Sequence, residues 1–283
     1  MLKLNSNVHS YKQLTLVMVL SDLSIKEIGI KLTKAGKLVA RPICVYGSET
    51  PPDNATPVAS ISRCIARAIL TTAVREDATL LYMGHETLEG CCPGGQAWFG
   101  FKDFPPYIKY FVSIGSKDFR NGAAEYLKAT PEIVEDSVKS IGKITPPGKF
   151  IVFQACEDLS GEDPGVRSIV CFGIGEQIRN LCTLIHFRSL NPFYSVLTPW
   201  GPSCATFVTY PAGMAKNAPY DSVFTGPVDP TGNAWFPAKY MALGIPISVA
   251  RRMCEDLEDS FIIKRPKIAY PDHRIEIKPA YEK

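Results

Sequence analysis

Apolar side chains recur every three or four residues in several parts of the chain, which is the spacing of an amphipathic helix. The first such stretch predicts a helix over residues 11–35, where Ile28 and Leu32 share one face. Ser24 and Glu27 stand ahead of this face with the spacing of a capping box, in which each side chain accepts a hydrogen bond from the other residue's backbone N–H. The chain is therefore expected to enter its fold through a helix.

A second helix is predicted over 57–75, with Thr56 as its N-cap. Ile65 and Ile69 lie on its apolar stripe, and because Cys64 follows the same stripe, we expect this cysteine in the core. The same period predicts further helices over 121–128, 131–141, 175–187 and 248–257. Short apolar runs between turn residues predict strands over 39–46, 79–83, 149–155, 167–172, 194–198, 223–228 and 241–247. Residues 205–215 fit a helix or a strand.

This alternation of strands and helices predicts an α/β or α+β fold with mixed sheets and flanking helices. A joint rich in turn residues near 145–148 suggests a boundary. We therefore expect an N-terminal half over 1–145 and a C-terminal half over 146–263. The polar remainder, 264–283, is expected to be an extended tail.

The two halves repeat one order of elements. Each runs from a strand through a helix to a second strand and then to a Gly/Pro loop with cysteine, in segments 39–46, 57–75 and 79–83 and again in 167–172, 175–187 and 194–198. We predict a diverged duplication of pseudo-repeated halves, in which Cys92 and Cys204 hold corresponding places and their loops converge on one cleft. Coincidence between common α/β units is the alternative.

The most unusual stretch is Gly-Cys-Cys-Pro-Gly-Gly, at 90–95. Glycines leave backbone N–H groups accessible, and such groups hold anions or stabilise a thiolate. Cys92 is therefore the candidate nucleophile, and Gly94 and Gly95 are candidate ligand-binding residues. The opposite interpretation is a turn whose cysteines only pack.

Acidic and imidazole groups lie close to this loop in the sequence. Because adjacent cysteines bind one ion poorly, a metal would need distant partners. The candidates for these distant metal ligands are Cys204, Cys156 and His186. The metal set that we predict is Cys91, Cys92, Cys204 and His85. Glu89 and Arg63 are the remaining candidate ligand-binding residues.

Composition narrows the class of protein. Lys and Arg number 31 against 28 Asp and Glu, a net charge of +3, which is too even for a nucleic-acid or membrane-surface binder. The longest apolar run near the N-terminus, 14–20, is far shorter than a membrane span. Nine scattered cysteines in a chain of 283 residues do not resemble a secreted disulfide scaffold. We therefore expect a cytoplasmic protein with reduced thiols.

Several short motifs resemble one family. Cys92-Pro93-Gly94-Gly95, Arg41-Pro42-Ile43-Cys44-Val45, Ser203-Cys204-Ala205 and Gly244-Ile245-Pro246 are similar to segments of the uncharacterised ArCR proteins, number 169 among the domains of unknown function. The likeness covers roughly 30–262. It implies a cytoplasmic prokaryotic protein and singles out Cys92 and Cys204, but it carries no established activity. Cys91 is additional to the pattern.

Three functions follow from these residues. The first is binding of a small-molecule ligand or a metal cofactor, such as a transition metal or an iron–sulfur cluster, at a cysteine-lined cleft, in a protein of anaerobic metabolism. The second is an enzyme that uses Cys92 as a thiolate nucleophile. The third is a non-catalytic accessory protein whose cysteines are structural.

Overall fold

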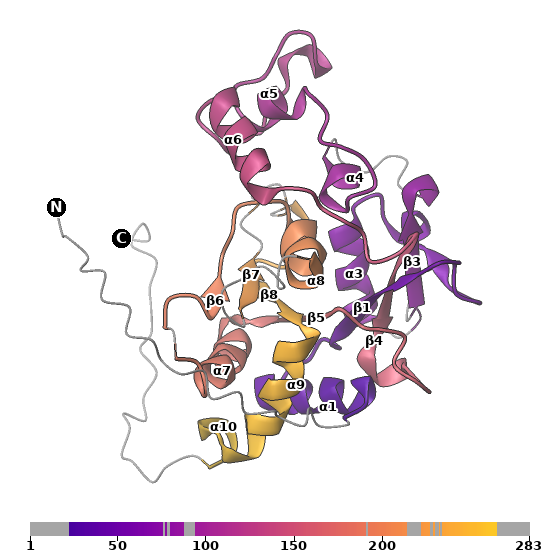
Figure 1. Cartoon of the computed structure of the whole chain (residues 1–283), viewed down its shortest axis with the longest axis vertical. Coiled ribbons are helices and arrows are strands. Elements are labelled where there is room, and N and C mark those ends of the chain that lie inside the picture. Colours follow the sequence, from indigo (N-terminus) through magenta and orange to yellow (C-terminus); the bar gives the residue numbers. More distant parts are fainter. Residues whose placement is uncertain are drawn as a thin grey trace, which may run out of the picture.

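One eight-stranded mixed sheet runs through the part of the chain that the structure, a computed structural model, describes (Figure 1). That part comprises residues 23–75, 77, 80–87, 94–190, 192–213, 222–226, 229, 232 and 234–264. The strands are β1 (Ile43–Ser48), β2 (Thr56–Pro57), β3 (Leu80–Gly84), β4 (Phe150–Ala155), β5 (Ser168–Ile174), β6 (Val196–Leu197), β7 (Val223–Gly226) and β8 (Tyr240–Pro246). Their order is β2-β3-β4-β1-β5-β8-β7-β6.

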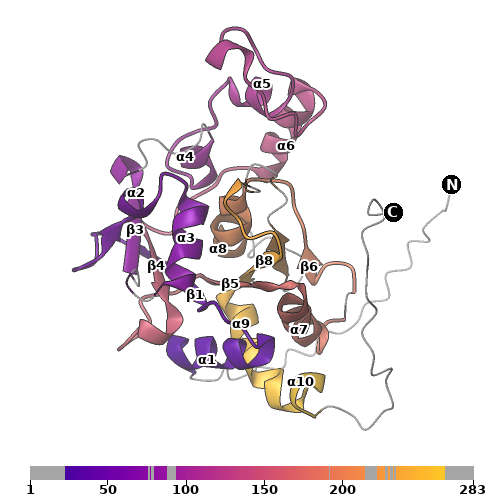
Figure 2. The same ribbon diagram turned by 180° about the vertical axis from the view of Figure 1, so that it is seen from behind.

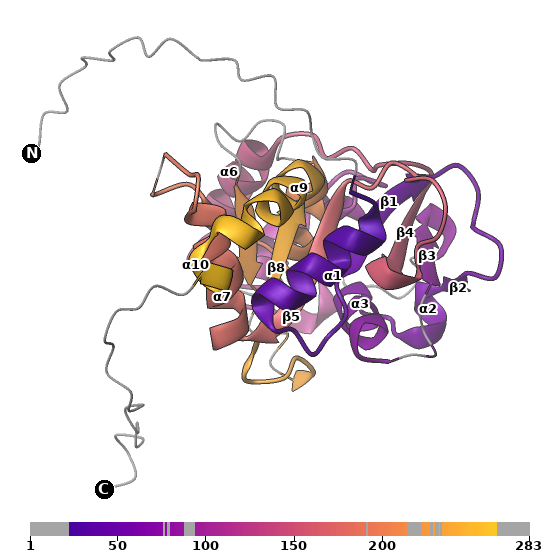
Figure 3. The same ribbon diagram turned by 90° about the horizontal axis from the view of Figure 1, so that it is seen from below.

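Helices cover both faces of this sheet. The helices in the described residues are α1 (Ile25–Gly36), α2 (Val58–Ile61), α3 (Ile65–Val74), α4 (Gly95–Trp98), α5 (Ile108–Val112), α6 (Pro131–Ile141), α7 (Gly175–His186), α8 (Tyr210–Gly213), α9 (Ile247–Asp256) and α10 (Phe261–Lys264). A π-helical turn, η4 (Ala205–Thr209), leads into α8. Helices α1, α7 and α9 pack together on one face (Figure 3), while α3 and η4 pack on the other. The mixed α/β class predicted from the sequence is confirmed.

The first four residues of the central strand β1 are buried on both faces of the sheet. Ile43 and Val45 point into the core under α3, and Cys44 and Tyr46 point into the core under α1. Successive side chains of a strand face opposite sides, so a sheet covered on both faces needs apolar residues at every position. β1 pairs antiparallel with β4 on one side and with β5 on the other.

Helix α1 forms as its sequence predicts from residue 25 onward, and the residues before 23 lie outside the described part. Ser24 Oγ accepts from the Glu27 N–H at 3.2 Å, and Glu27 Oε2 accepts from the Ser24 N–H at 2.8 Å. Gly29 is required by packing, because a Cβ there would lie 2.5 Å from the Cβ of Cys156. This glycine lets α1 approach the sheet edge closely.

Two predicted helices are wrong in part. The helix over 57–75 is interrupted, because Ser62 is extended and its Oγ accepts from the Cys64 N–H at 3.1 Å. Cys64 is therefore the half-buried N-cap of α3 and does not lie within a continuous apolar stripe. The segment 121–128 is not a helix, since only a 3₁₀ turn at 120–122 precedes extended chain. There, left-handed conformations at Asn121 and Tyr126 prevent a helix.

The strand order is the same in both directions from the central β1–β5 pair. It reads β1, β4, β3, β2 on one side and β5, β8, β7, β6 on the other. A duplication would produce this order, and common ancestry stays a prediction. By this order, β6, predicted over 194–198, corresponds to β2. It does not correspond to the strand predicted over 79–83, as the sequence suggested. Cys64 and Cys204 then correspond, because each directly precedes a helix at the same distance after its short strand. The expected match of Cys204 with Cys92 does not follow from this order.

A small subdomain stands at one end of the sheet. Residues 94–141, called the cap here, carry α4, α5 and α6; α4 lies close to the sheet, and α5 and α6 project from it (Figure 2). α6 begins and ends as predicted, with Thr130 as N-cap and Gly142 as C-cap. The cap has its own apolar cluster, built on Ile108, Val112 and Val134. β4 follows the cap and pairs with β1 and β3, so the chain returns to the first half of the sheet after the expected joint at 145–148.

Buried and exposed positions on α3 give a test of this packing. Ile65 is 2% exposed, whereas Arg67 on the same helix is exposed. Ile65→Ala is expected to lower the free energy of unfolding by ~2–5 kcal/mol, through lost burial and a residual cavity. Arg67→Ala is expected to change it by less than ~0.5 kcal/mol. Urea unfolding measures both, and a larger loss from Arg67→Ala would contradict the packing.

Candidate functional site

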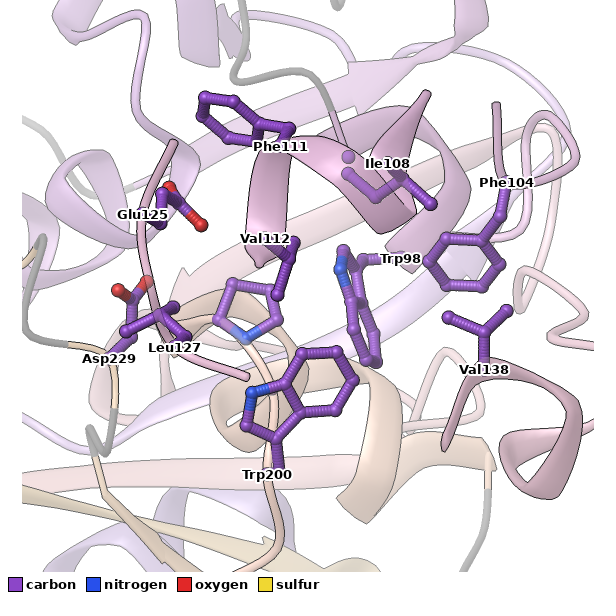
Figure 4. A pocket seen from close by; sticks show the side chains of 13 residues that line it. Trp98, Phe104, Ile108, Phe111, Val112, Glu125, Leu127, Val138, Trp200 and Asp229 are labelled. Carbon is purple, nitrogen blue, oxygen red and sulfur yellow. The ribbon is translucent and has the colours of Figure 1, made fainter. Parts of the chain in front are cut away.

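A cavity of about 70 Å³ lies where the cap meets the second half of the sheet (Figure 4). Its wall is mostly aromatic and aliphatic, and it consists of Gly94, Trp98, Phe104, Ile108, Phe111, Val112, Glu125, Leu127, Val138, Trp200, Gly201, Pro202 and Asp229. At ~10–15 Å³ for each water centre, this volume holds about five waters, roughly the space of a benzene-sized molecule. We call it the cap pocket.

Two tryptophans close the cap pocket from different parts of the sequence. Trp98 ends α4, directly after the cysteine loop, and Trp200 lies in the Gly/Pro loop before Cys204. Their rings meet edge to face, with centroids 5.9 Å apart and planes at 69°. Phe104 meets Trp98 in the same manner at 5.1 Å. Edge-to-face pairs place the positive edge of one ring on the negative face of another and fix both rings.

Hydrogen bonds hold both tryptophans at their backbones. The Thr209 hydroxyl donates to the Trp98 carbonyl, and the Tyr210 hydroxyl donates to the Trp200 carbonyl. Thr209 and Tyr210 belong to the helical run of η4 and α8. A Cβ at Gly201 would be crowded, because it would lie 3.0 Å from the Tyr210 hydroxyl and 3.3 Å from the Trp98 ring. The aromatic wall is thus held by the helix on the sheet.

Two carboxylates, Glu125 and Asp229, face each other at one side of the cap pocket (Figure 4). Burial, together with the smaller effect of the negative charge of Asp229, raises the pKa of Glu125 to about 7. The Glu125 N–H donates to the Phe111 carbonyl at 2.8 Å, which ties this segment to α5. Glu125 therefore titrates close to neutral pH, at a place where apolar walls strengthen electrostatic interactions.

The glycines of the predicted site lie at the cap pocket. Gly94 lines it, and Gly95 is the buried first residue of α4. Cys204 is 7% exposed and belongs to the core directly behind Pro202. Its loop therefore reaches the same cavity as Gly94, although its thiol does not line that cavity.

The other predicted site residues either do not line the cavity or fall outside the residues that the structure describes. Arg63 is exposed in the break between α2 and α3, and His85 is exposed in the 3₁₀ turn after β3. Neither lines the cap pocket. Cys91, Cys92 and Glu89 lie outside the described residues.

Within the described ranges, no group of three or more His, Cys, Asp or Glu side chains is placed to hold a metal ion. Of the distant partners considered, Cys156 is buried under α1 and His186 is exposed at the end of α7. Burial raises the pKa values of the Cys156 and Cys171 thiols, and the neighbouring thiol of Cys44 raises that of Cys156 further. Cys156 and Cys171 are therefore neutral core side chains.

Sequence reasoning missed the acidic side of the cap pocket. Glu125 falls in the segment 121–128, predicted to be helical, and Asp229 directly follows the strand predicted over 223–228. Nothing in the spacing joins them, because they meet only through the packing of the cap on the second half. The sequence does carry an aromatic signal there, in Trp98, Phe99 and Phe101. Trp98 is 4% exposed and packs in the core while it also forms the pocket wall.

Comparison with known proteins gives one match. A family model described as uncharacterised ArCR matches residues 31–256. No curated protein and no solved structure matches the chain. In addition, the described helices include none with the length and apolar character needed to cross a membrane.

The pKa of Glu125 predicts how stability depends on pH. The folded chain holds this proton up to about pH 7, whereas the ordinary glutamate value is 4.5, so the folded chain binds more protons between these values. Stability should therefore fall as pH rises through this window. In urea unfolding at about pH 5 and about pH 8, Glu125→Gln should lose less stability than the wild type across that interval. Glu49→Gln, which removes an exposed carboxylate, is the control. An unchanged pH dependence in Glu125→Gln would contradict this prediction.

Proposed function

The chain belongs to the uncharacterised ArCR family, and we propose that it binds a small organic molecule in the cap pocket. The observation that carries this proposal is the meeting of Trp98 and Trp200 around a cavity. Trp98 closely follows the cysteine loop in the sequence, and Trp200 lies in the Gly/Pro loop before Cys204. A cavity with aromatic walls and a few converging polar groups is the usual form of a small-molecule site.

The composition of the wall supports a ligand with an apolar body. Ile108, Val112 and Leu127 complete the aromatic wall, and polar side chains enter only at Glu125 and Asp229. An apolar body gains from leaving water in proportion to the area it buries. The two carboxylates would orient the ligand, because they are the charged groups that the wall offers to a polar end.

A second candidate is chemistry at Cys92, and the position of Gly94 favours it. Cys92 precedes Gly94 by two residues in the sequence, and Gly94 lines the cap pocket. A thiolate there would act on a ligand held by the pocket, as the enzyme alternative requires. Without reactivity at Cys92, the accessory-protein alternative is favoured. A metal or iron–sulfur centre would need Cys91 and Cys92 together with ligands other than His85, which is exposed and away from the cavity.

Filling the cavity tests the binding proposal. Val138 lies on α6 with its side chain at the cap pocket, while Ile133 on the same helix is 45% exposed. We expect benzyl alcohol and benzylamine to raise the thermal unfolding temperature of the wild type and of Ile133→Phe. Val138→Phe should lose this response, because the new ring occupies the cavity. An equal response in Val138→Phe would place the binding elsewhere.

Thiol labelling tests the second candidate. Brief iodoacetamide treatment of the native, metal-free protein near neutral pH is expected to label Cys92 before Cys64, because neighbouring glycines expose backbone donors that favour the thiolate. A compound that fills the cap pocket should slow labelling at Cys92 alone. Cys91 is the matched control, since it has the same neighbours in the sequence. Equal and slow labelling of Cys64, Cys91 and Cys92, with no metal bound, would favour a structural role for the loop.

A further inference from the structure

The charge of the cap pocket has one sign. Among its described lining residues, Glu125 and Asp229 are the ionisable ones, and both are acids. The remaining lining groups are apolar or aromatic side chains, glycines and a proline. Aromatic faces carry negative electrostatic potential and attract cations. The wall and the carboxylates therefore favour the same kind of charge.

We propose that the cap pocket selects a ligand that carries a positively charged amine on a ring-sized apolar body. The ammonium group lies between Glu125 and Asp229, and the body lies among Trp98, Trp200 and Phe111. This inference rests on the proposed function and names the ligand class. Beyond the proposed function, it assigns the specificity of the pocket to the two carboxylates.

The empty pocket has an electrostatic cost that an amine removes. Burial in the pocket wall and, to a lesser extent, the negative charge of Asp229 both disfavour the ionised form of Glu125. A bound ammonium donates to both and offsets both charges. A neutral ligand leaves the repulsion in place, and an anion increases it. The site therefore discriminates between ligands mainly by charge.

The chain's own cations show that these rings accept positive charge. Lys128 Nζ lies over the Trp200 ring, 4.7 Å from its centroid. The Arg120 guanidinium lies over the Phe111 ring at 5.9 Å. Neither cation lines the cavity, so its interior stays acidic while its walls are in contact with cations from outside.

Glu125 is positioned by its backbone. Tyr126 has a left-handed backbone (φ 54°), which is rare for an aromatic residue, and its side chain is 72% exposed. Its neighbours Glu125 and Leu127 both line the cap pocket. The Leu127 N–H donates to the Val112 carbonyl at 2.9 Å, which fixes the segment on α5. A strained conformation held by hydrogen bonds at a cavity rim is typical of a binding site.

Three ligands of one size test the inference: benzylamine, benzyl alcohol and benzoate. Isothermal titration calorimetry at about pH 8, where Glu125 is ionised, is expected to show benzylamine binding about tenfold tighter than benzyl alcohol, with benzoate weakest. Glu125→Gln and Asp229→Asn should each lower the affinity for benzylamine about tenfold and leave that for benzyl alcohol unchanged. Glu125→Asp should restore part of the preference. Asp103→Asn removes an exposed charge beside Phe104 and is the control.

The outcomes separate this inference from the proposed function. Equal affinities for benzylamine and benzyl alcohol, or a preference for benzoate, would overturn the amine selection while binding in the cap pocket stands. An unchanged preference in both Glu125→Gln and Asp229→Asn would also overturn it. Failure of all three compounds to bind would contradict the proposed function itself.

Discussion

The fold depends on the antiparallel pairing of β1 with β5. Three residue pairs, Ile43 with Val170, Cys44 with Ile169 and Val45 with Ser168, join the two groups of four strands into one sheet. Each strand is buried on both faces, so the pairing lies between the two main cores. Because it fixes one half of the sheet beside the other, the cap of the first half reaches the loops of the second. The cap pocket forms between the cap and these loops as a result.

The cap pocket follows from an asymmetry between the halves. The chain inserts the cap between β3 and β4, whereas only 227–239 separate β7 from β8. The cap is too small to bury its apolar side chains alone, and it covers them partly with Trp200 from the other half. The contact between Trp200 and Trp98 borders a cavity, and the polar side of this cavity is acidic. Packing and site chemistry therefore share the same residues.

Local signals in the sequence predicted local structure well. The Ser24–Glu27 capping box and the Thr130 cap defined two helix starts, because capping depends on neighbouring residues alone. The break at Ser62 was missed, since the apolar period continues across it. The Glu125–Asp229 pair was beyond reach, because distant segments meet there through tertiary packing. Gly94 was found for its backbone freedom, and the structure adds that it lines a cavity.

The central claim is that one ligand touches both halves of the chain at the cap pocket. The most direct measurement is the NMR shift of the tryptophan side-chain N–H signals on titration with benzylamine. Trp98 and Trp200 line the pocket, and Trp235 packs against Phe236, outside the lining. We expect the signals of Trp98 and Trp200 to move together with one dissociation constant while that of Trp235 stays in place. Movement of Trp235 alone, or of neither pocket tryptophan, would contradict this account.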